Sequence, residues 1–155
     1  MPRPSDAQLA IDTAVRFLAQ RPRSEDEVRQ RLRRAGVDEA VIDGTLAQLR
    51  RQRLLDDTAF ARYWVEQRQT FRPRGARLLR AELARLGVDA ALAREAAGGT
   101  GSAAEDAYRA AVRRARQLGG ENERTFKTRL SQFLARRGFD WDVVSTVVER
   151  LWRER

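Results

Sequence analysis

The sequence contains no cysteine and no histidine, which removes thiol chemistry, the usual zinc ligands and the commonest general base. Proline is rare, at four residues in 155, and runs of β-branched residues are absent. Alanine, leucine, arginine and glutamate are abundant instead, and all four favour helices. The composition therefore predicts an all-α protein that is not an enzyme and holds neither a cofactor nor a metal ion.

Long apolar segments are also missing. No apolar run approaches the roughly 18 residues of a membrane span, and the first residues, MPRPSDAQLAI, lack the apolar core of a signal peptide. The absence of cysteine fits a reducing compartment. We therefore expect a soluble cytoplasmic protein that has no membrane association and acts as a monomer.

Positive charge is what the sequence has in excess. The formal net charge is +9, and Lys127 is the only lysine among 31 basic residues. One interpretation is that a polyanion, or a partner with acidic grooves, binds this surface. The other is that arginine is simply common in the organism's proteins and forms a solvated surface. Charge alone does not separate these interpretations.

One short pattern occurs three times, as Leu-x-x-x-Gly-Val-Asp at residues 32–38 and 83–89 and as Leu-x-x-x-Gly-Phe-Asp at 134–140. Gly87 follows Gly36 by 51 residues, and Gly138 follows Gly87 by the same 51. A fixed period that keeps apolar, glycine and acidic positions is typical of a repeat protein.

Each residue of this pattern has a role at a helix end. Glycine readily adopts the left-handed conformation that terminates a helix, and the flanking leucine and Val or Phe suit the apolar contact of a Schellman turn. The aspartate that follows is a good N-cap for the next helix. We therefore predict a helix, a tight turn and a second helix in each copy, with positive φ at Gly36, Gly87 and Gly138.

The remaining start and stop signals complete three units of three helices. Ser24 and Glu27 form a capping box, Asp56 and Asp57 open another helix, and residues 102–105 (SAAE) form a second capping box. The predicted fold is an all-α row of three tandem three-helix repeats, at residues 1–54, 55–99 and 100–155, in an extended, curved arrangement.

Three features have both a chemical and a structural interpretation. Asp56 and Asp57 suggest acid–base or metal chemistry, but a cap and a first-turn acid explain them better. Residues 98–102 (GGTGS) suggest a phosphate loop, but no lysine precedes the Ser/Thr and no strand precedes the loop, which favours a linker. Trp141 and Trp152 suggest a partner surface, although packing in the core or at its edge is the commoner role.

Several of these segments together resemble the RecX family of bacterial RecA regulators. The resemblance covers nearly the whole chain and is carried by RPRS at 21–24, LLDD-x-x-FA-x-x-WV at 54–65, the segment from Gly75 to Val88, and RL-x-x-FLARRGF at 129–139. Two positions depart from the family pattern. Arg53 stands where the family usually has glycine, and Leu86 stands where a basic residue usually precedes the turn glycine.

The resemblance implies a non-enzymatic protein that binds RecA filaments on single-stranded DNA, lies in the filament groove, and suppresses ATP hydrolysis and strand exchange. It also implies contact with single- or double-stranded DNA. A rival hypothesis is a helix–turn–helix protein that binds DNA without RecA, but the third helices begin with Asp-Glu-Ala, Asp-Ala-Ala and Asp-Trp-Asp, which would repel phosphates. A third hypothesis is a helical scaffold unrelated to nucleic acid.

The candidate binding face lies on the predicted middle helix of the second unit. Helical periodicity places its arginines opposite or beside an apolar stripe, with Glu82 as the only acid. Arg85 would also be favourable at a helix C-terminus whatever its partner. A second candidate group lies in the third unit. The predicted residues are Arg72, Arg74, Arg77, Arg80 and Arg85, followed by Arg113, Arg114 and Arg116.

Overall fold

The computed structural model describes residues 4–98 and 103–155, and within these ranges it contains nine α-helices and no strand. The prediction of an all-α fold is therefore confirmed. The helices are α1 (Pro4–Gln20), α2 (Glu25–Arg34), α3 (Glu39–Arg51), α4 (Asp57–Phe71), α5 (Ala76–Arg85), α6 (Ala90–Gly98), α7 (Ala103–Gln117), α8 (Glu123–Arg136) and α9 (Trp141–Arg153).

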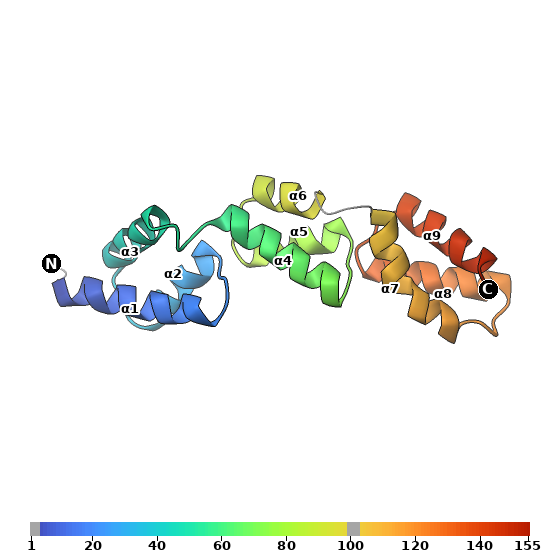
Figure 1. Ribbon diagram of the computed structural model, residues 1–155, viewed down its shortest axis with the longest axis horizontal. Helices are drawn as coiled ribbons and strands as arrows, with labels where there is room; N and C mark the ends of the chain where they lie inside the picture. Colours follow the sequence, from blue (N-terminus) through green and yellow to red (C-terminus); the bar gives the residue numbers. More distant parts are fainter. Residues whose placement is uncertain (1–3, 99–102) are drawn as a thin grey trace.

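The helices form three units in a row (Figure 1). We call α1–α3 the first unit, α4–α6 the second and α7–α9 the third, and we call α2, α5 and α8 the middle helices. The row is extended, with the two ends of the chain in the outermost units (Figure 1). None of the described helices is long and apolar enough to cross a membrane.

Each unit has its own small hydrophobic core. The first centres on Leu32, Ile42 and Leu46, the second on Val65, Leu79 and Leu83, and the third on Phe126, Leu130 and Leu134, all of them completely buried. The buried positions of the middle helices recur at the predicted spacing. Because the three cores are separate, the row depends on contacts between neighbouring units.

The three predicted glycine turns are confirmed. The φ angles of Gly36, Gly87 and Gly138 are 80°, 79° and 87°. At the end of α5, the amide of Val88 donates to the Leu83 carbonyl at 3.0 Å. The amide of Gly87 donates to the Ala84 carbonyl, also at 3.0 Å. These are the two bonds of a Schellman turn, and both recur at the ends of α2 and α8.

The helix starts agree with the sequence only in part. The capping box of Ser24 and Glu27 is present, and Asp56 accepts two backbone amides at the start of α4. Asp38 and Asp140 occupy the predicted N-cap positions but make no capping hydrogen bond. The linker predicted at 98–102 and the capping box predicted at 102–105 involve residues 99–102, which lie outside the described residues.

Arg53 has a backbone conformation that suits glycine. Its φ is 59°, the only positive value of a non-glycine residue in the described part of the chain. The residue lies between α3 and α4, at the position where the sequence departs from the RecX pattern. A left-handed residue with a Cβ costs about 1–2 kcal/mol, so this chain tolerates strain at the turn that leads into the second unit.

The junction between the first and second units joins the start of α2 to the end of α5. The Ser24 hydroxyl donates to the Leu86 carbonyl at 2.6 Å. Beside it, the Glu25 amide donates to the Asp57 carboxylate at 2.8 Å. Burial raises the pKa of Asp57 above its ordinary value, and the Glu25 amide partly offsets this effect. Ser24, the N-cap of α2, and Asp57, in the first turn of α4, therefore each begin a helix and also connect the first unit to the second.

The junction between the second and third units uses the same positions, 51 residues later. The Gly75 amide donates to the Arg137 carbonyl at 2.7 Å. A Cβ on Gly75 would lie 2.1 Å from the Gly138 carbonyl oxygen, so a side chain at this N-cap has no room. Gln69 in α4 donates to Asp106 in α7 at 3.0 Å and completes the contact.

At both junctions, therefore, the N-terminus of one middle helix meets the C-terminus of the next. The partial positive charge of the first helix end faces the partial negative charge of the second, so the dipoles of α2, α5 and α8 are arranged head to tail. The two junctions therefore share one arrangement, in which a donor at the start of one middle helix meets the C-cap carbonyl of the next.

Replacing Gly87 by alanine should destabilise the protein more than replacing Gly36. Both substitutions put a Cβ in a left-handed conformation, which costs about 1–2 kcal/mol. Only at Gly87 would this Cβ meet a neighbour, the Asp26 Cβ at 2.3 Å, whereas nothing lies within 4 Å at Gly36. The clash should add about 1–3 kcal/mol. Urea unfolding of both variants measures the difference, and equal losses would contradict this account of the junction.

Candidate partner interface

The arginines predicted on and before α5 do not form one free surface. Arg74 donates to both oxygens of Glu82 at 2.8 and 3.0 Å, and its side chain is only 16% exposed. Arg68, in α4, lies 3.3 Å from the same carboxylate. Contrary to the expectation, the Arg74 side chain does not face solvent, because its hydrogen bonds to Glu82 hold it against α4 and α5.

The other four predicted arginines of this group, Arg72, Arg77, Arg80 and Arg85, are exposed. Arg77 reaches across the second junction and donates to the Ala135 carbonyl at 3.0 Å. The Arg72 side chain makes no ion pair or hydrogen bond with the described residues. Arg80 and Arg85 lie farther along α5, toward the first junction. This group is therefore spread along the second unit and onto the second junction.

A residue that the sequence analysis missed strengthens the positive charge at this junction. Arg137, the C-cap of α8, is half-buried, and burial together with repulsion from Arg72 and Arg74 lowers the pKa of its guanidinium. Arg72 and Arg74 of the second unit therefore lie close enough to Arg137 of the third unit to repel it, and Glu82 pairs with Arg74. The signal that could have found Arg137 is its register, since it occupies the position of Leu86 in the next repeat.

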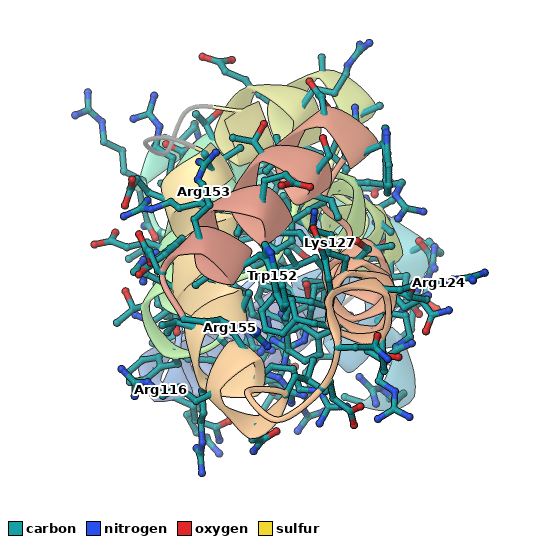
Figure 2. All side chains as sticks on the ribbon, turned by 90° about the vertical axis from the view of Figure 1, so that its right-hand side faces the viewer. Arg116, Arg124, Lys127, Trp152, Arg153 and Arg155 are labelled. Carbon is teal, nitrogen blue, oxygen red and sulfur yellow. The ribbon has the colours of Figure 1, made fainter. Side chains whose placement is uncertain are left out.

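The second predicted group of arginines lies in the C-terminal half of α7, in the third unit, apart from the group on and before α5. Arg113 and Arg116 are exposed, whereas Arg114 is half-buried and donates to Gln117 at 3.1 Å. Figure 2 looks onto the outer end of the third unit and shows Arg116 at its margin, with Arg155 nearer the middle. The structure thus places the eight predicted arginines in two places rather than on one face.

The sequence analysis also missed a pocket where aromatic and basic side chains meet. We call it the Trp64 pocket. It has a volume of about 240 Å³. Phe71, at the end of α4, is 80% exposed, and the Arg68 guanidinium lies 4.3 Å from the centre of the Trp64 ring. The indole nitrogen of Trp64 is buried and has no hydrogen-bond partner. The lining residues are Arg21, Tyr63, Trp64, Gln67, Arg68, Phe71 and Arg72.

The two tryptophans of α9 have different environments. Trp152 packs against Phe126, with ring centres 5.3 Å apart, and the Arg155 guanidinium lies 3.5 Å from the centre of its ring. Trp141 is 71% exposed. The packing interpretation is therefore right for Trp152 and wrong for Trp141, because Trp141 is the first residue of its helix and lies beyond the third core.

The aspartates considered for chemistry are explained by the fold. Asp56 caps α4 and Asp57 binds the Glu25 amide. The described residues contain no group of three or more acids that could hold a metal ion. The start of α3 is also acidic, with Glu39 bound to Arg29 and Arg33, which is unfavourable for a base-reading helix.

The geometry therefore defines a class: a tandem helical-repeat protein in which arginines of two neighbouring units lie close together at one junction. Comparison with known proteins identifies the family. The models for the first, second and third three-helix domains of RecX match residues 10–49, 56–96 and 104–148, in that order. The chain belongs to the RecX family.

Curated relatives agree with the domain match. Regulatory protein RecX of Amycolatopsis mediterranei is 39% identical over 140 residues, which are 89% of this chain and 80% of the relative. That of Chlorobium limicola is 35% identical and covers 90% and 87% of the two chains. That of Geobacillus thermodenitrificans is 37% identical, and this chain spans about half of its length, 52%.

Solved structures show the same fold. A crystal structure of RecX from Lactobacillus salivarius superposes with a TM-score of 0.87 at 21% identity, covering 96% of this chain and 98% of that one. A second crystal structure, of regulatory protein RecX, superposes with a TM-score of 0.82 at 23% identity, covering 93% and 72%. At these identities the likeness concerns the fold alone.

Replacing Arg74 by alanine should destabilise the protein by about 1–3 kcal/mol, because the poorly exposed Glu82 carboxylate would lose its two hydrogen bonds. Arg80→Ala is the matched control on the same helix and should change stability by less than about 0.5 kcal/mol. Urea unfolding of both variants distinguishes the roles. Equal stability of the two variants would show that Arg74 is available to a partner after all.

Proposed function

We propose that this protein binds RecA filaments assembled on single-stranded DNA and slows both ATP hydrolysis and strand exchange by RecA, without catalysing a reaction itself. The match of all three units, in order, to the three RecX domains carries this proposal. The extended row supports it, because several weak contacts along a filament add up when the units are held at fixed spacing.

The contact surface we propose is the arginine cluster at the second junction, with the exposed arginines of α5 beside it. Arg72 and Arg74 lie near Arg137 there, and Arg77 reaches the same end of α8 at the Ala135 carbonyl. An anion would relieve the repulsion that, together with burial, lowers the pKa of Arg137. DNA phosphates and acidic side chains of a filament both supply such charge. Arg74 contributes to the local potential but is held by Glu82.

A second candidate function is direct contact with single-stranded DNA, and the Trp64 pocket favours it. Single-strand sites combine aromatic rings, on which bases stack, with basic groups for the phosphates. Phe71 offers an exposed ring, and Arg72 links the pocket to the arginine cluster. The rival idea of a helix–turn–helix reader acting on duplex DNA has no comparable support, given the acidic starts of the third helices.

The protein should slow DNA-dependent ATP hydrolysis by RecA at substoichiometric ratios. Reversing Arg72, Arg77 and Arg80 to glutamate should weaken this inhibition by about ten-fold or more and reduce its salt dependence, because fewer ionic contacts remain. The matched control reverses Arg16, Arg51 and Arg94, which are exposed elsewhere and change the net charge equally. Equal effects of both triples would remove the cluster from the interface, and no inhibition by the unmodified protein would overturn the proposed function.

Phe71→Ala should weaken binding to a thymidine oligonucleotide by about five- to fifty-fold, as expected for the loss of one stacked base. Trp141→Ala removes an exposed aromatic ring outside the pocket and should leave binding unchanged. An abasic oligonucleotide of equal charge should bind both variants alike. Fluorescence anisotropy in the absence of RecA measures the affinity of each variant for each oligonucleotide. If Phe71→Ala and Trp141→Ala lose equal affinity for the thymidine oligonucleotide, the pocket does not bind bases.

A further inference from the structure

Both junctions are built from one pair of surfaces. The first surface is the C-terminal end of a middle helix, with its C-cap carbonyl and its left-handed glycine. The second surface is the N-terminus of another middle helix, with a small N-cap residue. At the first junction these are the Leu86 carbonyl and Ser24, and at the second they are the Arg137 carbonyl and Gly75. Three units contain three C-terminal surfaces, of which only two are covered.

The third C-terminal surface, at the end of α2, is open. It contains Ala35 and Gly36, which lie 51 residues before Leu86 and Gly87. The Schellman turn is complete there, yet none of the described residues lies within 4 Å of the place that a Gly36 Cβ would occupy. At Gly87 and Gly138 the neighbouring unit occupies that place, with the Asp26 Cβ at 2.3 Å and the Leu78 Cβ at 2.5 Å. The end of α2 therefore has the backbone shape of a junction surface without its occupant.

A groove of about 430 Å³ runs over this open surface, between α1 and the end of α2. Leu9 lines it and is 62% exposed, although it is one of the larger apolar residues. Asp6 also lines it, in the register of Asp57, which binds a backbone amide of the neighbouring unit at the first junction. We call this groove, with Ala35, Gly36 and Val37 at its base, the α2 groove.

A second copy of the chain offers no matching N-terminus. The position 51 residues after Gly75 is Phe126, which is completely buried in the third core. Helix α8 begins earlier, with Asn122 as its N-cap. Arg155 holds the loop before it, donating to the carbonyls of Gly119 and Glu121 at 3.2 and 2.9 Å. Figure 2 shows Arg155 and Trp152 together on this outer end.

We infer that the α2 groove binds the N-terminus of a helix in a partner protein, a helix that begins with serine or glycine as its N-cap. The two covered junctions set the chemistry. The N-cap hydroxyl or amide donates to the C-cap carbonyl, here that of Ala35, and the positive end of the incoming helix meets the negative end of α2. A large N-cap side chain is excluded, as the close approach at Gly75 shows. This inference does not depend on RecA.

The probe is a synthetic peptide with the sequence of residues 21–36, the natural occupant of the first junction. A lactam bridge between Arg29→Glu and Arg33→Lys keeps it helical, because short helices are marginal alone. In the full-length protein the surface at Gly87 is already covered, so the peptide should shift the amide resonances of Gly36 and Val37 and leave Gly87 and Val88 unchanged.

Two controls define the site. The Ser24→Val peptide lacks the N-cap hydroxyl and should bind about five-fold more weakly, as for the loss of one hydrogen bond. The Leu9→Arg protein places bulk and positive charge in the groove and should bind the original peptide at least about five-fold more weakly. A scrambled peptide of the same charge should cause no localised shift. The measurement follows the amide shifts of the protein while the peptide is added to about 1 mM, which is the order of the effective concentration of a contact tethered by a short linker.

Three results would overturn the inference. One is the absence of localised shifts at Gly36 and Val37, and another is equal binding of the scrambled peptide. The third is concentration-dependent self-association of the protein in sedimentation velocity that Leu9→Arg abolishes, which would make a second copy the occupant. Localised shifts, weakened by both Ser24→Val and Leu9→Arg, in a protein that remains monomeric would support a partner helix.

Discussion

The contact between the end of one middle helix and the start of another holds this molecule in a row. At each junction a backbone or hydroxyl donor at the start of one middle helix donates to the C-cap carbonyl of the neighbouring helix. Because the start of one helix approaches the turn glycine of the next so closely, the contact demands a left-handed glycine on one side and a small N-cap on the other. The same requirement explains why the glycine spacing stays fixed while much of the surface sequence varies between units.

The sequence predicted the parts of the fold that are decided locally. Gly36, Gly87 and Gly138 end their helices through bonds to residues a few positions away, and Ser24 and Asp56 cap through residues two or three positions away. Family resemblance and periodicity then defined the units. Contacts between units could not be predicted in this way, since Gly75 stood out only as part of a segment that resembles the RecX family, and its fit against Gly138 depends on how the units pack.

The candidate surface was less predictable for a related reason. Helical periodicity assigns a direction to each side chain but not the length of an arginine, which allows Arg74 to return to Glu82 and Arg77 to reach Ala135. Many of the arginines are used to pair with acids, to cover aromatic rings or to satisfy carbonyls. The net charge of the chain therefore does not say which arginines are available to a partner, and the contacts of each side chain have to be known first.

The head-to-tail order of the middle helices also gives the molecule a direction. All three helices run from the third unit toward the first, so their peptide dipoles add along the row, with the positive end at the start of α8 (Figure 1). Turning the molecule end for end would exchange the positive and negative ends of this dipole, and it would also exchange two end surfaces that differ from each other. On a polymer that has its own polarity, the two orientations of this molecule would therefore differ in energy.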